Sequence, residues 1–405
     1  MELHLPLILD GATGTQLQKR GYTNAQCAEA WVLEHPEAIA DIQRRYVDAG
    51  SRVVYAPTFG ANRVKLEENG IFNRVREFNL RLVELSRRAV DSRAWVAGDI
   101  APTGKFLAPL GDTSFEELLE IYTEQAEALE EAGVDLFVIE TTMTLPEARA
   151  AVLAVKSVSR RPVFVTFTCD ESGKTLTGTD VVAALLVMQG MGVDAFGLNC
   201  SVGPEAMLTQ LKRLRPYAEV PLIAKPNAGM PEIEDGRTVY RCTPEEFTAV
   251  AGEMARAGVA IFGGCCGTEP EHISALASSA DDADIALPAP ENRDMLPLST
   301  EKQAFFLPSD VPVGTPLPCD AQLIDALEAA EEDPAPVVCI RIEREEELDN
   351  FSDCQFAISK PLCLQCERAD LLEQALQRYQ GRAMYDGGLG EDTLLPLQEK
   401  YGLIF

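Results

Sequence analysis

The sequence predicts a (β/α)8 barrel followed by a small α/β domain, and three observations support this fold class. Short apolar runs alternate with longer amphipathic runs eight times between Pro6 and about Ala280. The longer runs carry apolar residues at three- and four-residue spacing, which is typical of helices that bury one face. Glycine follows several of these runs directly, where a left-handed residue closes a helix. Eight strand-then-helix repeats over about 275 residues fit a closed parallel barrel.

Eight strands are expected where the short apolar runs occur. In chain order they are Leu7 to Leu9, Val53 to Phe59, Trp95 to Ile100, Leu136 to Thr141, Val163 to Cys169, Ala195 to Cys200, Leu222 to Pro226 and Ala260 to Gly264. The clearest of the intervening helices are Phe115 to Ala132, Val181 to Met191 and Pro244 to Ala257. Because a helix separates each strand from the next, we expect the sheet to be parallel.

We expect three parts: the barrel at residues 1–285, a linker rich in Asp and Pro at 286–314, and a small acidic α/β domain at 315–405. Roughly a hundred residues are too few for a second barrel, so we expect about four strands in the last part. Its expected elements are helix Ala321 to Glu331, strand Val337 to Ile342, a short helix near Glu345 to Asn350, strand Leu362 to Leu364, helix Ala369 to Tyr379 and strand Gly402 to Phe405.

Composition excludes several classes of partner. The formal net charge of −29 argues against nucleic acid or an anionic membrane, because both would repel the surface. No run approaches the ~20 apolar residues of a membrane span, and no basic segment followed by an apolar one opens the chain. We therefore expect a cytoplasmic protein. Its eleven cysteines then indicate reduced thiols or metal ligands instead of a disulfide framework.

Three cysteines are placed to share a metal ion. Cys200 ends the sixth expected strand, and Cys265 and Cys266 end the eighth. One strand separates these two around the barrel, so the thiols lie within reach of one zinc ion at Zn–S distances of about 2.3 Å. Any one of them alone fits a buried apolar filler equally well. Their coincidence at two strand ends favours a zinc site, and three ligands leave the open position of catalytic zinc.

The ligand type narrows the chemistry. Three thiolates more than offset the charge of zinc and leave a weak Lewis acid, so water activation is disfavoured. A thiol that enters the open position loses its proton, whereas a free thiol with a pKa of ~8.5 is only slightly ionised at neutral pH. We expect the other cysteines to be packing residues. Cys363 and Cys366 form a CxxC pair, but no second pair follows.

Five segments together resemble the zinc-dependent homocysteine S-methyltransferases. They are Asp10 to Thr15, Thr58 to Asn62, Glu140-Thr141, Asn199-Cys200 and Gly263 to Thr268. That family includes betaine- and S-methylmethionine-dependent enzymes and the N-terminal module of cobalamin-dependent methionine synthase. The resemblance covers about residues 5 to 280. It implies a (β/α)8 barrel, zinc on the three cysteines and homocysteine as the methyl acceptor.

The remaining motif residues suit an amino-acid substrate. Asp10 and Glu140 follow the first and fourth strands, so both carboxylates are expected at the barrel mouth, where they would hold an ammonium group. The alternatives are a helix N-cap for Asp10 and a solvated loop position for Glu140. Backbone N–H groups in the glycine-rich turn would receive the substrate carboxylate. The further candidate contacts are Gly11, Thr13, Thr15, Thr58, Asn199 and Asn227.

The resulting hypothesis is methyl transfer to the zinc-bound thiolate of homocysteine, giving methionine. The donor is expected from outside the chain: a methyl-corrinoid protein, or a sulfonium or ammonium compound such as S-methylmethionine. Two alternatives stay open. One is a different thiol acceptor, and the other is a non-catalytic binding or scaffold subunit of a corrinoid methyl-transfer system whose acidic C-terminal domain docks a partner.

A second, fainter resemblance lies in the last part of the chain. The segments Pro361 to Cys366, Ala369 to Tyr379 and Gly381 to Gly387 are similar to one strand-helix-strand piece of the pterin-binding barrel that follows the homocysteine module in cobalamin-dependent methionine synthase. That family has an acidic residue and Ser where this chain has Gln365 and Cys366, and Asn where it has Asp386. We therefore expect a truncated remnant without folate binding.

Overall fold

The computed structural model describes residues 4–108, 110–234, 237–281, 285–291 and 294–405. They form two compact units. The first contains the residues up to Thr177, Val193–Arg215 and Glu219–Ala289; the second contains Gly178–Gly192, Pro216–Ala218 and Pro290–Phe405. Positions 282–284 of the expected barrel and 292–293 of the expected linker lie outside the described residues. No helix among the described residues is long and apolar enough to cross a membrane.

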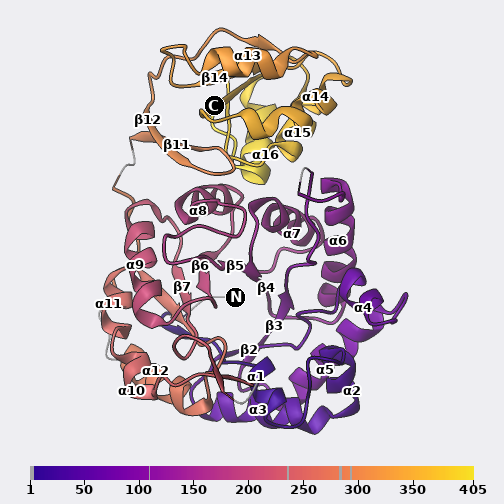
Figure 1. Ribbon diagram of the computed structural model, residues 1–405, viewed down its shortest axis with the longest axis vertical. Coiled ribbons are helices and arrows are strands. Elements are labelled where there is room, and N and C mark those ends of the chain that lie inside the picture. Colours follow the sequence, from indigo (N-terminus) through magenta and orange to yellow (C-terminus); the bar gives the residue numbers. More distant parts are fainter. Residues whose placement is uncertain (1–3, 109, 235–236, 282–284, 292–293) are drawn as a thin grey trace. The chain divides into compact units, whose positions relative to one another are not determined.

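Eight parallel strands form the barrel sheet, in the order β1-β10-β7-β6-β5-β4-β3-β2, and helices surround it (Figure 1). The Arg52 N–H donates to the Ile8 carbonyl at 2.7 Å, which joins the two ends of the sheet. The predicted (β/α)8 architecture is therefore confirmed. The strands are β1 (Leu7–Ile8), β2 (Val53–Tyr55), β3 (Trp95–Ile100), β4 (Leu136–Thr142), β5 (Val163–Phe167), β6 (Ala195–Asn199), β7 (Leu222–Lys225) and β10 (Val259–Phe262).

The helices of the first unit follow the expected alternation, with two local differences. The expected helix from Pro244 to Ala257 is broken into two pieces, and a hairpin of β8 (Glu232–Glu234) and β9 (Arg237–Val239) follows β7. The helices are α1 (Gly14–Gln18), α2 (Ala28–Glu34), α3 (Pro36–Asp48), α4 (Arg63–Glu68), α5 (Val75–Val90), α6 (Phe115–Glu131), α7 (Leu145–Val158), α9 (Pro204–Leu214), α10 (Pro244–Thr248), α11 (Ala251–Arg256) and α12 (Pro270–Asp281).

Alternating side chains fill the barrel interior, because successive residues of a strand point to opposite faces. Its apolar floor consists of Leu7, Leu9, Val53, Tyr55, Ala97, Leu136, Val138, Phe164, Ala195, Ile223 and Ile261. The same inward alternation continues toward the carboxyl end of the barrel in six of the strand segments. The inward residues there lie two or four positions after the last floor residue of each segment, and they are Asp99, Glu140, Thr166, Asn199, Lys225 and Gly263. The floor is therefore apolar, and the carboxyl end of the barrel is lined mostly by polar groups.

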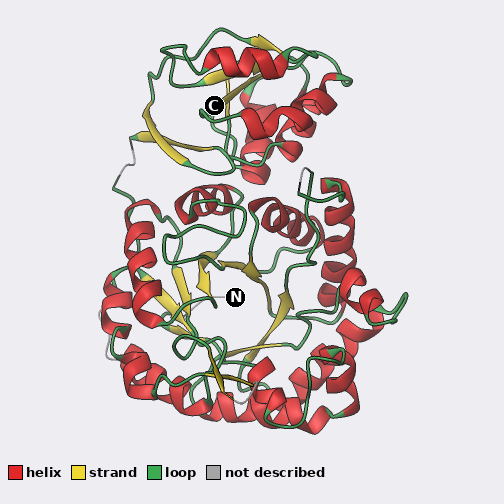
Figure 2. Ribbon diagram, viewed as in Figure 1, coloured by secondary structure: helices red, strands yellow, loops and turns green. Residues whose placement is uncertain are grey.

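The second unit contains a four-stranded parallel sheet, as expected. Its strands are β13 (Leu317–Pro318), β14 (Val338–Arg341), β15 (Leu362–Gln365) and β16 (Met384–Tyr385), in that order. Its helices are α8 (Val181–Gly190), α13 (Leu323–Ala330), α14 (Glu347–Cys354), α15 (Ala369–Arg378) and α16 (Glu391–Tyr401), drawn in red in Figure 2.

Two details of the second unit differ from expectation. The stretch expected as a linker contains an antiparallel hairpin of β11 (Met295–Ser299) and β12 (Ala304–Pro308). The expected closing strand at Gly402 to Phe405 is reduced to a single parallel bridge between Met384 and Ile404. The sheet packs Val337, Cys339 and Cys363 into one apolar cluster.

Replacing Ile261 by Ala tests the barrel interior. Ile261 is fully buried, so the lost contacts and the cavity left behind should lower the free energy of unfolding by about 2–5 kcal/mol. The matched control is Ile233→Ala on β8, where the side chain is 75% exposed and the expected change is within about 0.5 kcal/mol. Urea denaturation of both variants measures the difference, and equal losses would contradict the described packing.

Candidate functional site

The three predicted cysteines meet at the carboxyl end of the barrel. Cys200 directly follows β6, and Cys265 and Cys266 lie in the turn between β10 and α12. Their sulfur atoms all lie within 4.8 Å of one another, and the sulfurs of Cys200 and Cys266 are 4.0 Å apart. Among the described residues this is the one cluster of His, Cys, Asp or Glu with metal-ligand spacing.

The backbone at the end of β6 is held in an uncommon conformation. Cys200 and Ser201 have φ angles of 60° and 59°, a region that costs free energy for residues other than glycine. Two hydrogen bonds fix this turn: the Cys200 N–H donates to the Lys225 carbonyl at 3.1 Å, and the Val202 N–H donates to the Cys200 carbonyl at 2.7 Å. The strained turn therefore directs the Cys200 side chain toward the other two cysteines.

Hydrogen bonds also fix the turn between β10 and α12, which carries Cys265 and Cys266. The Cys265 N–H donates to the Pro226 carbonyl at 2.8 Å, and the Thr268 hydroxyl donates to the Cys265 carbonyl at 2.8 Å. Gly267 has a φ of 80°, and a Cβ there would lie 2.2 Å from the Tyr240 ring. Only glycine fits this position, so the turn that carries two adjacent cysteines depends on it.

The three thiols of the cluster differ in pKa. Hydrogen bonds from Cys265 and Cys266 lower the pKa of Cys200 to about 3. The same hydrogen bonding raises the pKa of Cys266 to about 11 and that of Cys265 well above its ordinary value. Tyr240 also hydrogen-bonds the Cys266 sulfur, which lowers the pKa of Cys266. The cluster is thus a concentrated set of sulfur donors in which the thiolate form of Cys200 is favoured.

A buried charge cluster also lies inside the barrel mouth. Lys225 extends its ammonium group to 3.5 Å from Asp10 Oδ1 and 3.4 Å from Glu140 Oε2. The same nitrogen lies 3.5 Å from the centroid of the Tyr55 ring. Asp10 Oδ2 accepts the Tyr55 N–H at 2.8 Å, so this carboxylate also ties β2 to the residue after β1. The structure thus brings the two predicted carboxylates together around one lysine.

Burial controls the charge states in this cluster. It raises the pKa of Asp10 to about 6, against the opposing attraction of Lys225. It raises the pKa of Asp99 well above its ordinary value, and Glu140 adds to that shift. Burial alone would lower the pKa of Lys225, but the negative charges of Glu140 and Asp10 more than reverse this. These shifts favour the neutral form of Asp99 and the charged form of Lys225.

Within the described part of the chain, several buried polar atoms around the mouth have no hydrogen-bond partner. They are Tyr55 Oη, Asp99 Oδ1, Thr166 Oγ1 and Asn227 Oδ1. Buried polar atoms are nearly always hydrogen-bonded in native proteins, so a group of unsatisfied ones calls for an explanation. Asp99, Thr166 and Asn227 lie beyond the apolar floor to which Tyr55 belongs, which fits a site that receives a small polar ligand.

The remaining predicted residues lie around the same mouth. Asn199 accepts the Thr141 N–H at 2.8 Å and donates to the Thr141 hydroxyl at 2.8 Å. Asn227 hydrogen-bonds Cys200, and the Thr58 hydroxyl donates to the Asp99 carbonyl at 2.8 Å. In the glycine-rich turn at Gly11, the Ala12 N–H already donates to Thr268 Oγ1. Helix α1 follows this turn and begins at Gly14, directly after Thr13. Thr15 Oγ1 accepts the Gly267 N–H.

The sequence reasoning missed Lys225, Asp99, Tyr55 and Tyr240. The first three could have been found from the sequence. Each lies two residues after an apolar inward residue of its strand, on β7, β3 and β2 respectively, so each side chain points to the barrel interior. Tyr240 follows a short exposed hairpin, and no periodic pattern distinguishes it. Its contact with the cysteine turn is visible only in three dimensions.

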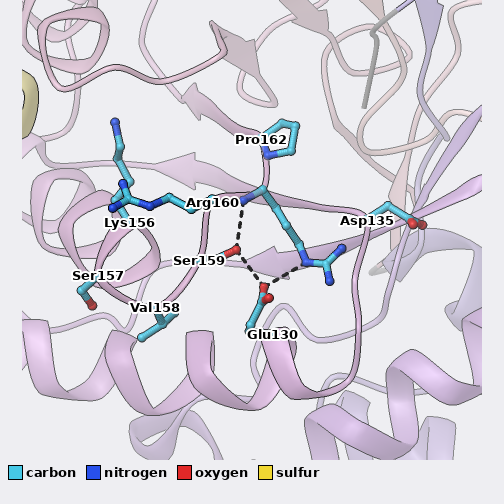
Figure 3. Close-up of a pocket in the computed structure, with 9 residues that line it drawn as sticks. Glu130, Asp135, Lys156, Ser157, Val158, Ser159, Arg160 and Pro162 are labelled. Atoms are coloured by element: carbon cyan, nitrogen blue, oxygen red, sulfur yellow. Dashed lines mark hydrogen bonds and ion pairs between the residues drawn. The ribbon is translucent and has the colours of Figure 1, made fainter.

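A different cavity of about 530 Å³ lies beside the segment from Lys156 to Pro162. These residues directly precede β5, so the cavity lies near the amino ends of the strands, away from the cysteines. Arg161 and Ser159 both bond Glu130, at 3.0 and 2.7 Å, and Figure 3 shows the side chains of Ser159 and Glu130 pointing toward each other. Residues at this end of a (β/α)8 barrel generally serve stability, and the cavity takes no part in the site.

The second unit has its own cavity of about 550 Å³ at the carboxyl ends of β14 and β15, lined in part by Gln365 and Cys366. Gln365 Oε1 accepts from Arg341 Nε at 2.9 Å. The Cys366 thiol donates to the Arg368 carbonyl at 3.2 Å, and the Asp386 N–H donates to the Leu364 carbonyl at 3.1 Å. Gln365 and Cys366 are thus engaged within the unit itself.

Replacing Asn199 by Ala tests the bridge between β6 and β4. The change removes both bonds to Thr141 and should lower the free energy of unfolding by about 1–3 kcal/mol. Asn24→Ala is the matched control, because Asn24 accepts a single exposed hydrogen bond from Gln18 and should change stability by less than about 0.5 kcal/mol. Chemical denaturation measures both, and an unchanged Asn199→Ala protein would contradict the bridge.

Comparison of the chain with known proteins identifies its family. The family model described as Homocysteine S-methyltransferase matches residues 7–280. Over 291 residues the chain is 35% identical to the methionine synthase of Mycobacterium leprae (strain TN) and 34% identical to that of Mycobacterium tuberculosis (strain ATCC 25618 / H37Rv). The matched region covers 67% of this chain and 24% of each relative. The chain thus spans about a quarter of the length of these curated relatives.

Solved structures give the same result. The homocysteine methyltransferase MmuM from Escherichia coli, in its oxidized and metallated forms, has a TM-score of 0.58 and 26% sequence identity with this chain. The likeness covers 67% of this chain and 95% of MmuM. The chain belongs to the homocysteine S-methyltransferase family.

Proposed function

We propose that the protein transfers a methyl group from an external donor to the thiol of homocysteine, giving methionine. The observation that carries this proposal is the convergence of three cysteine sulfurs beside a buried pair of carboxylates at the barrel mouth. The names of its relatives agree, since MmuM is a homocysteine methyltransferase and the mycobacterial proteins are methionine synthases.

The cysteine cluster fits zinc. Four ligands in a tetrahedron at about 2.3 Å from the metal are about 3.8 Å from one another, and the Cys200 and Cys266 sulfurs are 4.0 Å apart. Thiolates are preferred zinc ligands, and three of them leave one position for a further ligand. We infer that Cys200, Cys265 and Cys266 hold the ion. When bound, zinc supplies a Lewis acid that lowers the pKa of a thiol entering the remaining position.

The other groups orient the acceptor. Glu140 is 9% exposed and Asp10 is 1% exposed, so Glu140 is the more accessible carboxylate for an ammonium group. Asn199 Nδ2 lies 3.8 Å from the Cys265 sulfur and fixes one ligand. Tyr240 hydrogen-bonds the Cys266 sulfur and fixes another. The acceptor is thus recognised at both ends, by sulfur at the cysteines and by charge at Glu140.

In the proposed reaction the acceptor loses its thiol proton to solvent, and its sulfur forms a bond to the donor methyl carbon. The bond between that carbon and the donor breaks, and the donor keeps the electron pair. A methyl-corrinoid protein and a sulfonium compound such as S-methylmethionine both satisfy this balance. Large apolar side chains are exposed on the loops after β2, β5 and β7, at Phe59, Leu176 and Met230.

Removing one cysteine should remove the metal. Cys200→Ala leaves two of three ligands, so zinc content measured by mass spectrometry should fall from about one equivalent to near zero. Cys354→Ala is the matched control, because Cys354 is a buried cysteine of α14 outside the cluster, and its zinc content should not change. Full zinc retention in Cys200→Ala would contradict the ligand assignment.

Methionine formation tests the activity directly. The zinc-loaded protein is incubated with homocysteine and, in turn, a methylated corrinoid protein and S-methylmethionine. Glu140→Gln removes a charged acceptor and should raise KM for homocysteine by roughly 10- to 100-fold. Glu84→Gln, an exposed change on α5, is the control and should leave KM unchanged. Failure of the wild-type protein to form methionine with any donor would remove the proposal, and turnover of another thiol alone would reassign the acceptor.

A further inference from the structure

The loop of residues 58–62 follows β2 and belongs to neither the cysteine cluster nor the charge cluster. Its backbone is bonded to three buried side chains that come from three different helices. The three bonds join the Gly60 N–H to Glu29 of α2 at 2.7 Å, Asn79 of α5 to the Ala61 carbonyl at 2.8 Å, and Gln125 of α6 to the Thr58 carbonyl at 2.8 Å. Loops are generally more mobile than the elements they connect, so these bonds fix a segment that would otherwise move.

Thr58 connects this loop to the barrel mouth. Its side chain is fully buried, and its hydroxyl donates to the Asp99 carbonyl at 2.8 Å and accepts the Asp99 N–H at 3.1 Å. Asp99 lies two residues after Ala97 of the apolar floor, so its side chain points to the barrel interior near the carboxyl end of β3. A continuous path of hydrogen bonds therefore runs from Gln125 through Thr58 to a residue that lines the mouth.

Gln125 is an unfavourable choice for stability alone. Its side chain is fully buried, and its Oε1 has no hydrogen-bond partner among the residues that the structure describes. A buried unsatisfied polar atom costs about 1–3 kcal/mol. The Thr58 carbonyl does not depend on Gln125, because it also accepts the Ala61 N–H at 2.9 Å. An apolar side chain of similar size would therefore serve folding about as well, and polar groups kept at a cost in stability are typical of functional sites.

We propose that Gln125 is a positioning residue of the acceptor site, which holds the loop after β2 in place and acts through Thr58 on Asp99. This role rests on the proposed function, because it takes the acceptor as the ligand of the barrel mouth. Gln125 is fully buried and does not itself touch the acceptor. Its effect falls on the affinity for the acceptor, while the zinc content stays unchanged because the cysteines follow β6 and β10.

The first test is hydrogen exchange of the loop, which needs no ligand. Gln125→Met keeps the approximate side-chain volume and removes the bond to Thr58, so the amides of residues 58–62 should exchange roughly 5- to 10-fold faster, as expected for one lost hydrogen bond. Thr123→Val is the matched control on the same helix, because the Thr123 hydroxyl donates to the Leu119 carbonyl within α6. Unchanged exchange of this segment in Gln125→Met would overturn the inference.

The second test measures homocysteine binding to the zinc-loaded protein by calorimetry. The Kd should rise roughly 5- to 10-fold in Gln125→Met and stay unchanged in Thr123→Val. A purely structural role of Gln125 would lower the fraction of protein that binds, which appears as a reduced stoichiometry, and would leave the Kd of the folded protein unchanged. That result would also overturn the inference.

The third test examines the path through Thr58. Thr58→Val removes the hydroxyl that bonds Asp99 and should itself weaken homocysteine binding. If Gln125 acts through Thr58, adding Gln125→Met to Thr58→Val should change the Kd by less than about twofold further, because coupled residues are not additive. Fully additive losses would show that Gln125 acts by another route and would contradict the proposed path.

The role of Gln125 and the proposed function fail in different ways. A wild-type protein that binds homocysteine but forms no methionine with any donor loses the proposed reaction, and a raised Kd in Gln125→Met still supports the role of Gln125. A wild-type protein that forms methionine, with an unchanged Kd in Gln125→Met, keeps the reaction and loses the role of Gln125. A wild-type protein that binds no homocysteine overturns both.

Discussion

The site depends on one constraint, the alternation of side chains along parallel strands whose carboxyl ends meet at a single mouth. Asp10, Glu140 and Lys225 are far apart in the sequence and come together because Asp10 follows β1, Glu140 lies near the end of β4 and Lys225 ends β7. Strand β7 contributes to both the charge cluster and the cysteine cluster. Its last side chain enters the charge cluster, while the carbonyl of the same Lys225 accepts the N–H of Cys200. A change in the register of β7 would therefore disturb the sulfur cluster and the charge cluster together.

Backbone strain also occurs at this place. Thr141, Cys200 and Ser201 have φ angles of 57°, 60° and 59°, and Thr is a branched residue for which this region is especially unfavourable. Asn199 bonds Thr141 through both its amide atoms, so the strained ends of β4 and β6 are tied to each other. Such conformations persist only where the surrounding contacts over-determine them. The barrel thus uses stability gained in its apolar floor to hold Cys200 in an otherwise unfavourable geometry.

Much of this arrangement could be predicted from the sequence. The eight strands, the barrel and the meeting of Cys200 with Cys265 and Cys266 follow from apolar runs and from the rule that strand ends converge. Lys225 was missed because the strand from Leu222 to Pro226 was identified without assigning its inward face. The hairpin β11–β12 was missed because its prolines are more typical of a linker. Tyr240 lies beyond sequence reasoning, since its contact with Gly267 depends on the path of a loop.

In the proposed function, buried groups bind the acceptor and surface loops face the donor. This difference explains why the acceptor is easier to infer from the sequence and the fold than the donor. In the proposed function, the acceptor is recognised by buried groups: the cysteine cluster binds its thiol, and the carboxylate of Glu140 binds its ammonium group. Buried groups are fixed by packing, and both the sequence pattern and the fold report them. In the proposed function, the donor approaches from outside, where Phe59, Leu176 and Met230 are exposed on loops. Loops vary without cost to the barrel, so one buried acceptor site is compatible with several donors, and the identity of the donor is carried by surfaces that the core does not constrain.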